Sequence, residues 1–247
     1  MSGDFRPCAV VPTFDNALTV RAAVQGVRVH LADVLVVDDG SGPAGRAACE
    51  ALAAEGLARL ERRGRNGGKG AAVKTGLRAA SALGFTHVLQ IDADGQHDAD
   101  RIPDFLSAGK RRPDALVLGC PVYDASAPKG RVAARRVTAF WVGLELGRRD
   151  LVADAMVGFR LYPLAAALAA RTRGDRMDFD IEIAVRLARA GTPVINLPVN
   201  IRYPAAADGG ISHFQPLRDN LRFFALHTRL CTTGLLQWAV RNRQGRR

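Results

Sequence analysis

Two carboxylates at the end of a hydrophobic run could hold a metal ion. Asp92 and Asp94 lie in the segment Ile91-Asp-Ala-Asp-Gly-Gln-His97, and positions two apart in an extended chain point the same way. They can therefore face one hard divalent cation, which prefers oxygen ligands and shares its coordination shell with substrate phosphates. Gln96 is one further step in the same register. The alternative is an Asp-Gly turn with solvated carboxylates, because many loops contain such a pair.

A second acidic cluster, Val36-Val-Asp-Asp-Gly-Ser41, ends another hydrophobic run. Its glycine permits a tight turn, and the Asp39 carboxylate can accept hydrogen bonds from a base or a ribose. Asp39 or Ser41 could instead cap the helix that follows. The cluster is therefore either part of a nucleotide site or a helix start.

A third cluster, Arg65-Asn-Gly-Gly-Lys-Gly-Ala-Ala72, combines glycines with a cation. Lys69 can meet a phosphate near a helix N-terminus, although an ordinary glycine-rich helix start has the same composition. The chain lacks the P-loop spacing and has no G-x-G-x-x-G after a strand. The sequence therefore gives no specific support for an ATPase or a dinucleotide-binding protein.

These clusters need strands to position them. Short β-branched runs predict buried strands at residues 8–11, 34–37, 58–60, 87–91 and 115–118. Helix-length stretches separate the strands, so we expect residues 1–120 to form a doubly wound α/β unit with a mostly parallel sheet. Ligands bind where the strands of such sheets end. The polar segments at 12–16, 38–42 and 92–97 should therefore converge on one crevice.

The second half of the chain has a different pattern. From about residue 121 it predicts a polar loop that holds Lys129, Arg131, Arg135 and Arg136. A helix with aromatic side chains follows, through Phe140, Trp141 and Leu144. Residues 217–240 predict a long helix that could lie on a membrane but not cross it. With no internal repeat or low-complexity linker, residues 1–247 are expected to form a single domain.

Composition and charge narrow the functional classes. With 48% hydrophobic residues and 24% charged residues, the chain can bury a real core. A net charge of +11 attracts anions such as nucleic acid, phospholipid or phosphorylated small molecules. Aromatic residues make up only 6%, and no basic stripe is interleaved with aromatics, so we expect no nucleic acid partner.

Cysteines and hydropathy bear on the compartment. Cys8, Cys49, Cys120 and Cys231 stand far apart, without a C-x-x-C pair, and are expected to be reduced thiols. The sequence has neither the apolar run of a signal peptide nor an uncharged apolar stretch of the ~18 residues that span a bilayer. We therefore expect a cytoplasmic protein.

Taken together and in this order, the clusters resemble the family-2 inverting glycosyltransferases. These enzymes have the nucleotide-diphospho-sugar transferase (GT-A) fold, and the branch with the greatest similarity is the dolichyl- or polyprenyl-phosphate sugar synthases. The matching segments extend over nearly the whole chain: Val11-Pro-Thr-Phe-Asp-Asn16, Val36-Val-Asp-Asp-Gly-Ser41, Asn66-Gly-Gly-Lys-Gly70, Asp92-Ala-Asp-Gly-Gln-His97, Asp154 through Gly158-Phe-Arg160, and Phe179-Asp-Ile-Glu182. The resemblance divides the domain into a nucleotide-sugar half at 1–120, an acceptor half at 121–215 and a basic interfacial helix at 216–247.

The resemblance implies a UDP- or GDP-linked sugar as donor and Mg²⁺ or Mn²⁺ as cofactor. It assigns the metal to Asp92, Asp94 and Gln96. It assigns the donor to Pro12, Thr13, Asp15, Asp39, Lys69, Asp92 and Ala93. The usual Tyr-Asn-Glu of the first motif is Phe14-Asp15-Asn16 here, so the nucleotide is not named.

The resemblance also implies a lipid-linked acceptor, either a polyprenyl phosphate or the hydroxyl of a lipid or polyene. The acceptor-binding residues would be Arg131, Arg135, Arg202 and His213, although each alone could be an ordinary solvated or structural side chain. Catalytic carboxylates would come from Asp154, Glu182 and Asp94. Asp154 could instead pair with Arg160, and Asp178, Asp180 and Glu182 could cap a helix.

The family's long C-terminal membrane spans are missing. The basic segments instead predict a peripheral protein on anionic lipid at the inner face of the cell membrane. One alternative is a sugar-1-phosphate nucleotidyltransferase, which would place its Gly/Lys/Arg loop after the first strand, where this chain has residues 12–16. The other is a non-catalytic lipid-binding module, in which Asp92 and Asp94 could be replaced without loss.

Overall fold

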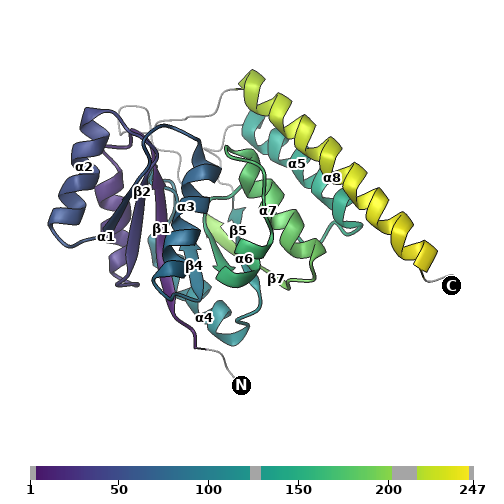
Figure 1. Ribbon diagram of the computed structural model, residues 1–247, viewed down its shortest axis with the longest axis horizontal. Coiled ribbons are helices and arrows are strands. Elements are labelled where there is room, and N and C mark those ends of the chain that lie inside the picture. Colours follow the sequence, from purple (N-terminus) through teal and green to yellow (C-terminus); the bar gives the residue numbers. More distant parts are fainter. Residues whose placement is uncertain (1–3, 123–128, 202–215, 245–247) are drawn as a thin grey trace.

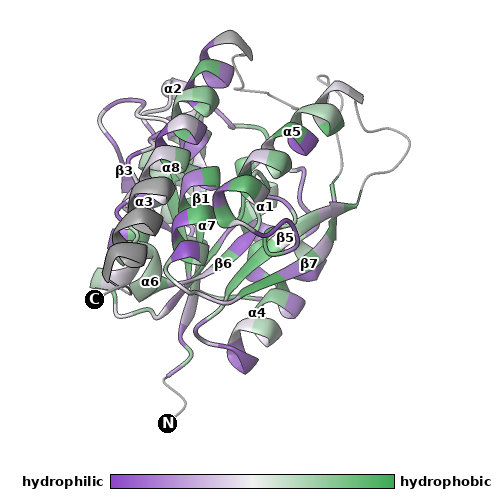
Figure 2. Cartoon of the chain, turned by 90° about the vertical axis from the view of Figure 1, so that its right-hand side faces the viewer, coloured by the Kyte–Doolittle hydropathy of each residue, from purple (hydrophilic) through white to green (hydrophobic). Residues whose placement is uncertain are grey.

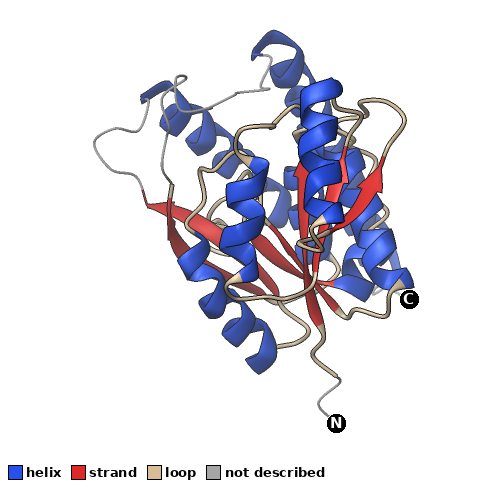
Figure 3. Cartoon of the chain, turned by 90° about the vertical axis from the view of Figure 1, so that its left-hand side faces the viewer, coloured by secondary structure: helices blue, strands red, loops and turns tan. Residues whose placement is uncertain are grey.

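Seven strands form one sheet, in the order β3-β2-β1-β4-β6-β5-β7, with helices on both faces (Figures 1 and 3). The computed structural model describes residues 4–122, 129–201 and 216–244. The strands are β1 Pro7–Thr13, β2 Val34–Asp38, β3 Arg59–Arg62, β4 His87–Gln90, β5 Leu116–Val122, β6 Arg160–Pro163 and β7 Val194–Asn200. The helices are α1 Val20–Arg28, α2 Pro43–Ala54, α3 Lys69–Ala82, α4 Ile102–Arg111, α5 Lys129–Leu146, α6 Leu164–Ala169, α7 Asp178–Arg189 and α8 Pro216–Gln244, with a short 3-10 turn, η1, at Ala99–Arg101.

The sheet is parallel except at β6. This strand runs antiparallel to both of its neighbours, β4 and β5, and it places Arg160 beside Gln90. The predicted doubly wound, mostly parallel sheet is confirmed, and β1 to β5 occur where the hydrophobic runs predicted them. Because β6 and β7 come from the second half of the chain, residues 1–120 and 121–215 share one sheet.

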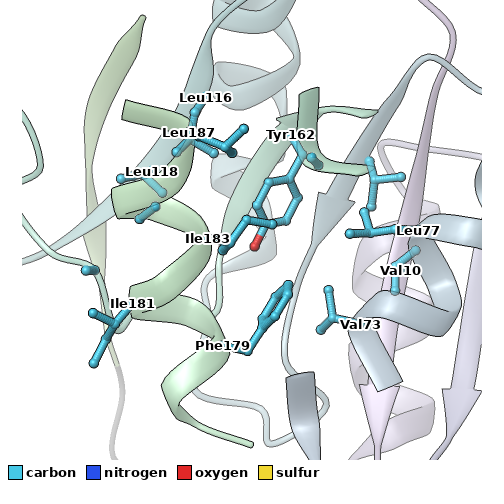
Figure 4. Close-up of a cluster of buried hydrophobic side chains, with 14 of the residues drawn as sticks. Val10, Val73, Leu77, Leu116, Leu118, Tyr162, Phe179, Ile181, Ile183 and Leu187 are labelled. Carbon is cyan, nitrogen blue, oxygen red and sulfur yellow. The ribbon is translucent and has the colours of Figure 1, made fainter. Parts of the chain in front are cut away.

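Side chains that alternate along the strands build a core on each face of the sheet. Val10 belongs to the core covered by α3, α5, α6, α7 and α8, whereas Val11 belongs to the core covered by α1, α2 and α4. In Figure 4, Val10 lies beside Leu77 of α3, with Phe179 of α7 close by. Figure 2 shows hydrophobic residues concentrated along the strands between these layers. The sheet is thus buried on both faces, as its continuous apolar strands require.

Helix α5 corrects one expectation. Lys129, Arg131, Arg135 and Arg136 were expected in a loop, but they lie on α5. Lysine and arginine are good helix formers, and Thr138, Val142 and Glu145, spaced at helical intervals, are buried against the body.

Helix α8 confirms the long helix predicted at 217–240, and it lies along α5 (Figure 1). The Trp141 ring stacks on His227 with 5.8 Å between centroids, and Glu145 Oε1 lies 2.8 Å from His227 Nδ1. Within the described part of the chain, no helix is both long and apolar enough to cross a bilayer.

Candidate active site

A pocket of about 300 Å³ opens at the carboxyl ends of β1, β2 and β4. Its walls include residues from the three strand-end segments at 12–16, 38–42 and 92–97 and from the glycine-rich cluster at 65–72: Pro12, Thr13, Phe14, Asn16, Asp39, Asn66, Gly68, Lys69, Asp92, Ala93, Asp94, Gln96 and His97. Parallel strands bring their carboxyl ends to one edge of a sheet, and the strand order reverses between β1 and β4, the point at which such sheets form a ligand crevice. The structure therefore brings together the segments whose spacing suggested chemistry.

Asp92, Asp94 and Gln96 line this pocket and carry side-chain oxygen atoms that could bind a metal ion. An Asp-Gly turn is present, because Gly95 has a φ of 72° and Asp94 Oδ1 accepts the Gln96 N–H at 3.0 Å. The carboxylates nevertheless line the pocket, and Asp92 Oδ1 is buried without a hydrogen-bond partner among the described residues. An unsatisfied buried oxygen of this kind suits a cation.

The described residues contain no group of three His, Cys, Asp or Glu side chains that could enclose a metal by themselves. Two carboxylates and an amide oxygen fit Mg²⁺ or Mn²⁺ if substrate phosphates complete the coordination shell. Burial, followed by the charge of Asp92, raises the pKa of Asp94. Burial would raise the pKa of Asp92 as well, but Lys69 and His97 outweigh it and hold the pKa far below its usual range.

Lys69 lies between two carboxylates. Its Nζ is 2.7 Å from Asp92 Oδ2 and 2.7 Å from Asp180 Oδ2. Burial alone would lower the pKa of Lys69, but Asp180 and Asp92 outweigh that effect and raise it. Asp180 also accepts a hydrogen bond from Gln90 Nε2 at 3.3 Å, and Gln90 Oε1 accepts one from the Tyr162 hydroxyl at 2.8 Å. A polar network thus connects the pocket to the sheet.

The sequence interpretation missed the part that Asp180 plays, because it treated this residue only as a possible helix cap. The available signal was Gln90, an amide that ends an otherwise apolar strand and that is fully buried. Buried polar side chains need partners, so Gln90 indicated a polar residue opposite β4, although it could not indicate which one.

Asp39 holds the glycine-rich loop in place. Its carboxylate accepts N–H groups from Gly67 at 3.1 Å and Gly68 at 2.6 Å, and it pairs with Arg63 Nε at 2.6 Å. Gly68 adopts a φ of 100°, which favours glycine. The suggested helix-capping role for Asp39 or Ser41 is wrong, because Gly42 is the N-cap of α2 and that end has no side-chain cap.

Asp15 is not among the pocket-lining residues. It adopts a φ of 56°, and its Oδ1 accepts the Gly42 N–H at 2.8 Å, while its own N–H donates to Ser41 Oγ at 2.9 Å. The side chain expected to touch the donor therefore joins the loop after β1 to the start of α2.

Asp154 is not among the pocket-lining residues, but it contacts Arg135, which is. Its Oδ1 accepts the N–H groups of Met156 at 2.7 Å and Val157 at 2.9 Å, and its Oδ2 pairs with Arg135 Nη1 at 2.7 Å. The suggested pairing of Asp154 with Arg160 is wrong, because the Arg160 Nη1 donates to the Asp180 carbonyl at 2.9 Å and its Nε to the Val157 carbonyl. Arg135 itself lines the pocket.

Glu182 lies outside the pocket walls. Its Oε2 accepts the N–H groups of Arg173 at 2.9 Å and Gly174 at 2.7 Å, and its Oε1 is 2.8 Å from Arg186 Nε and 3.0 Å from Arg229 Nη2. The side chain is fully buried. These contacts connect α7 to α8.

Three residues expected at the acceptor side cannot be placed. Arg131 belongs to α5, but its side chain lies outside the described residues, as do Arg202 and His213.

Gly158 offers a sharp test of the packing at this site. A Cβ at this position would overlap the Asp92 carboxylate, so Gly158→Ala should displace that carboxylate and lower the free energy of unfolding by about 1–3 kcal/mol, the usual effect of overpacking a buried site. Gly64→Ala is the matched control, because a Cβ there meets nothing within 4 Å. Equal urea denaturation midpoints of the two variants would show that Asp92 need not keep this position.

Comparisons with known proteins agree with this geometry. Residues 8–165 match the family model described as Glycosyl transferase family 2. Undecaprenyl-phosphate mannosyltransferase of Micrococcus luteus is 26% identical over 206 residues, covering 78% of this chain and 82% of that protein. Glucosyl-3-phosphoglycerate synthase from Mycobacterium tuberculosis in complex with UDP superposes with a TM-score of 0.68 at 17% identity, covering 92% of this chain and 80% of that one.

The same synthase in complex with Mn²⁺ and UDP-glucose gives a TM-score of 0.67 at 17% identity, covering 92% of this chain and 79% of that one. At this identity the likeness concerns the fold. The expected fold of the nucleotide-diphospho-sugar transferase (GT-A) type is confirmed.

Proposed function

The chain belongs to glycosyl transferase family 2, whose model covers residues 8–165, and from this membership we propose that it transfers a sugar from a UDP- or GDP-linked donor to a polyprenyl phosphate, with inversion of the anomeric centre. The observation that carries the proposal is the pocket in which Asp92, Asp94 and Gln96 lie beside Lys69. The relation to undecaprenyl-phosphate mannosyltransferase supports a prenyl phosphate as acceptor.

Asp92, Asp94 and Gln96 would hold Mg²⁺ or Mn²⁺. The ion, when bound, supplies positive charge that neutralises the diphosphate leaving group. The synthase structure with Mn²⁺ and UDP-glucose supports this choice of ion. Lys69 lies between Asp92 and Asp180, and it adds a cation at the start of α3 where a phosphate can bind. Pro12, Thr13 and Ala93 line the same pocket and would contact the donor.

The contacts of Asp154 favour a phosphate acceptor over a hydroxyl. A phosphate is already ionised and needs little base catalysis, whereas a hydroxyl needs a carboxylate to take its proton. Both oxygens of Asp154 are engaged, by two backbone N–H groups and Arg135. This arrangement leaves little room for a hydroxyl at Asp154, while the positive charge of Arg135 in the pocket wall favours an acceptor anion.

The experiment that tests this function is nucleoside diphosphate release from a panel of UDP- and GDP-sugars, with Mn²⁺ or EDTA and with polyprenyl phosphate present or absent. We expect release that requires both the metal ion and the lipid phosphate. Nucleotidyltransferase activity would instead convert a sugar 1-phosphate and a nucleoside triphosphate to a nucleoside-diphosphate sugar and pyrophosphate. If no sugar donor releases nucleoside diphosphate while the protein still binds lipid, the result would favour a non-catalytic lipid-binding module.

We also propose that α5 and α8 rest on an anionic membrane surface. Their exposed apolar side chains are Val137, Phe140, Leu144, Leu221 and Phe224. The protein carries a net charge of +11, and each cation near an anionic surface contributes about 1 kcal/mol. A basic protein with outward apolar residues on two adjacent helices fits an interfacial position.

Replacing both Phe140 and Phe224 by serine should weaken binding to vesicles that contain phosphatidylglycerol by about tenfold or more, because partial burial of each ring in the interface is lost. Cosedimentation measures this binding, and rising salt should release the wild-type protein. Val29→Ser is the control, since Val29 is also exposed, at the C-cap of α1, and α1 covers the face of the sheet opposite to α8. Equal loss in this control, or none in the double variant, would remove α5 and α8 from the membrane contact.

A further inference from the structure

Helix α8 contributes two charged residues to the pocket. Asp219 and Arg222 line it beside the strand-end clusters, although both lie outside the range that matches the family model, residues 8–165. Asp219 is 3% exposed, and its Oδ1 accepts a hydrogen bond from Arg222 Nη1 at 2.8 Å. A carboxylate so well buried is costly unless a cation or hydrogen bonds compensate it, and Arg222 is such a cation.

The packing of α8 explains why this pair reaches the pocket. Phe223, Leu226 and Leu230 are buried in the core beneath α8. Asp219 precedes Phe223 by four residues, and this spacing puts it on the same face of the helix, one turn nearer the start. The buried face of α8 therefore continues from apolar contacts into the pocket. Leu221, in contrast, is 62% exposed on the outer side of the same turn.

The pocket cations divide into two groups. On the donor side, Lys69 is engaged by Asp92 and Asp180, and Arg176 lies beside the glycine-rich loop, with its Nη1 3.5 Å from Asn66 Oδ1. Arg135 and Arg222 come from the two helices outside the strand-end clusters, and each is held by a buried carboxylate, at 2.7 Å from Asp154 and 2.8 Å from Asp219. The two arginines are therefore positioned in the same way.

An arginine held in this way suits a phosphate. A guanidinium has five N–H donors, so Arg222, which gives one to Asp219, has others for an anion, and the planar group matches two phosphate oxygens at once. Because the carboxylate fixes the arginine side chain before the anion binds, less conformational entropy is lost on binding. The diphosphate of a donor has Lys69, Arg176 and the metal-site carboxylates beside it, which leaves Arg135 and Arg222 for a second anion.

We propose that Arg222 binds the phosphate monoester of the acceptor together with Arg135, and that Asp219 is the positioning residue that holds Arg222. The proposal rests on the proposed function, because it assigns the acceptor of that same transfer. It gives α8 two tasks on two faces: the inner face supplies a phosphate ligand, and the outer face presents Leu221 and Phe224 to lipid. A phosphate headgroup with an apolar chain matches both faces.

The test measures binding rather than turnover, so that it does not depend on the transfer reaction. Geranyl phosphate is titrated into the protein in the presence of Mn²⁺ and the nucleoside diphosphate, using wild type, Arg222→Gln, Arg222→Lys and Asp219→Asn. We expect Arg222→Gln to weaken binding about 10- to 100-fold, the loss of hydrogen bonds to a charged group. Arg222→Lys should recover part of the affinity. The affinity for the nucleoside diphosphate should not change in any variant.

Asp219→Asn tests whether Asp219 acts by positioning Arg222. It should weaken geranyl phosphate binding, but by less than Arg222→Gln, and the double variant should bind no worse than Arg222→Gln alone, because Asp219 acts through Arg222. Arg136→Gln, at an exposed position of α5 outside the pocket walls, is the matched control and should bind normally. Glycerol 3-phosphate in place of geranyl phosphate distinguishes a lipid from a soluble phosphate monoester as the natural source.

Wild-type affinity in Arg222→Gln, no binding of either phosphate by the wild type, or an equal loss of nucleoside diphosphate affinity would overturn the assignment of Arg222. Additive losses in the double variant would overturn the positioning role of Asp219. If Arg222→Gln does not fold, Arg222→Lys and Asp219→Asn replace it, and wild-type affinity for geranyl phosphate in both variants would overturn the assignment. Failure of the proposed function is a separate result: the wild type would bind geranyl phosphate without transferring sugar to it.

Discussion

Replacing Asp94 by asparagine is expected to lower kcat for sugar transfer about 100- to 1000-fold. The change keeps the shape of the side chain but removes a negative charge from the proposed metal site, beside Asp92 and Gln96 in the pocket wall. A metal ion contributes several kcal/mol of charge stabilisation at a leaving group, and each 1.36 kcal/mol corresponds to tenfold in rate. Steady-state release of nucleoside diphosphate at saturating Mn²⁺ measures the effect.

Asp100→Asn is the matched control, because the Asp100 side chain is 90% exposed and lies outside the pocket walls. This variant should keep wild-type kcat. If Asp94→Asn also keeps it, the metal assignment fails and the Asp-Gly turn with solvated carboxylates describes the segment. Partial recovery of Asp94→Asn at high Mn²⁺ concentration would support weakened metal binding as the cause.

Replacing Arg160 by methionine is expected to lower the free energy of unfolding by about 3–5 kcal/mol, the range for breaking a buried ion pair by removing one partner. Arg160 is fully buried on β6. It donates to the carbonyls of Val157 at 2.9 Å, Ala155 at 3.2 Å and Asp180 at 2.9 Å, and its Nη2 lies 3.8 Å from Asp180 Oδ1. Methionine fills similar space but leaves these acceptors unpaired.

Urea denaturation followed by circular dichroism measures this change. Arg148→Met is the comparison, because Arg148 pairs with Asp150 at 2.8 Å while its side chain is 62% exposed. Exposed pairs contribute about 0–1 kcal/mol, so this variant should unfold close to the wild type. Similar urea midpoints for the two variants would mean that Arg160 does not stabilise the polar network that connects the pocket to the sheet.

The parts of the fold that the sequence predicted are those set by local pattern. The strands β1, β2, β4 and β5 contain apolar runs, and the polar segments after β2 and β4 follow them directly in sequence, so Asp92 and Asp39 could be placed at one edge of the sheet. β6 was missed because it is four residues long and begins with a buried arginine. Its partners at Asp180 and Gln90 are distant in sequence.

The residues whose positions were predicted wrongly are those set by backbone conformation or tertiary packing and not by local pattern. The Asp15 side chain turns to the start of α2, because the backbone at Asp15 has a φ of 56°, which no pattern of residue types specifies. The basic segment of α5 was expected to be a loop, since its charges obscured a buried face that only packing defines. Asp219 and Arg222 enter the pocket because α8 packs on α5 and α7, and that docking is tertiary.

Mass spectrometry of the lipid product tests the central claim most directly. The protein would be incubated with a polyprenyl phosphate and the sugar donor that supports nucleoside diphosphate release, with Mn²⁺ or with EDTA. The account predicts a glycosyl prenyl phosphate that forms only with the metal ion, with the anomeric configuration inverted relative to the donor. Donor breakdown to free sugar with unmodified prenyl phosphate, or transfer that continues in EDTA, would contradict it.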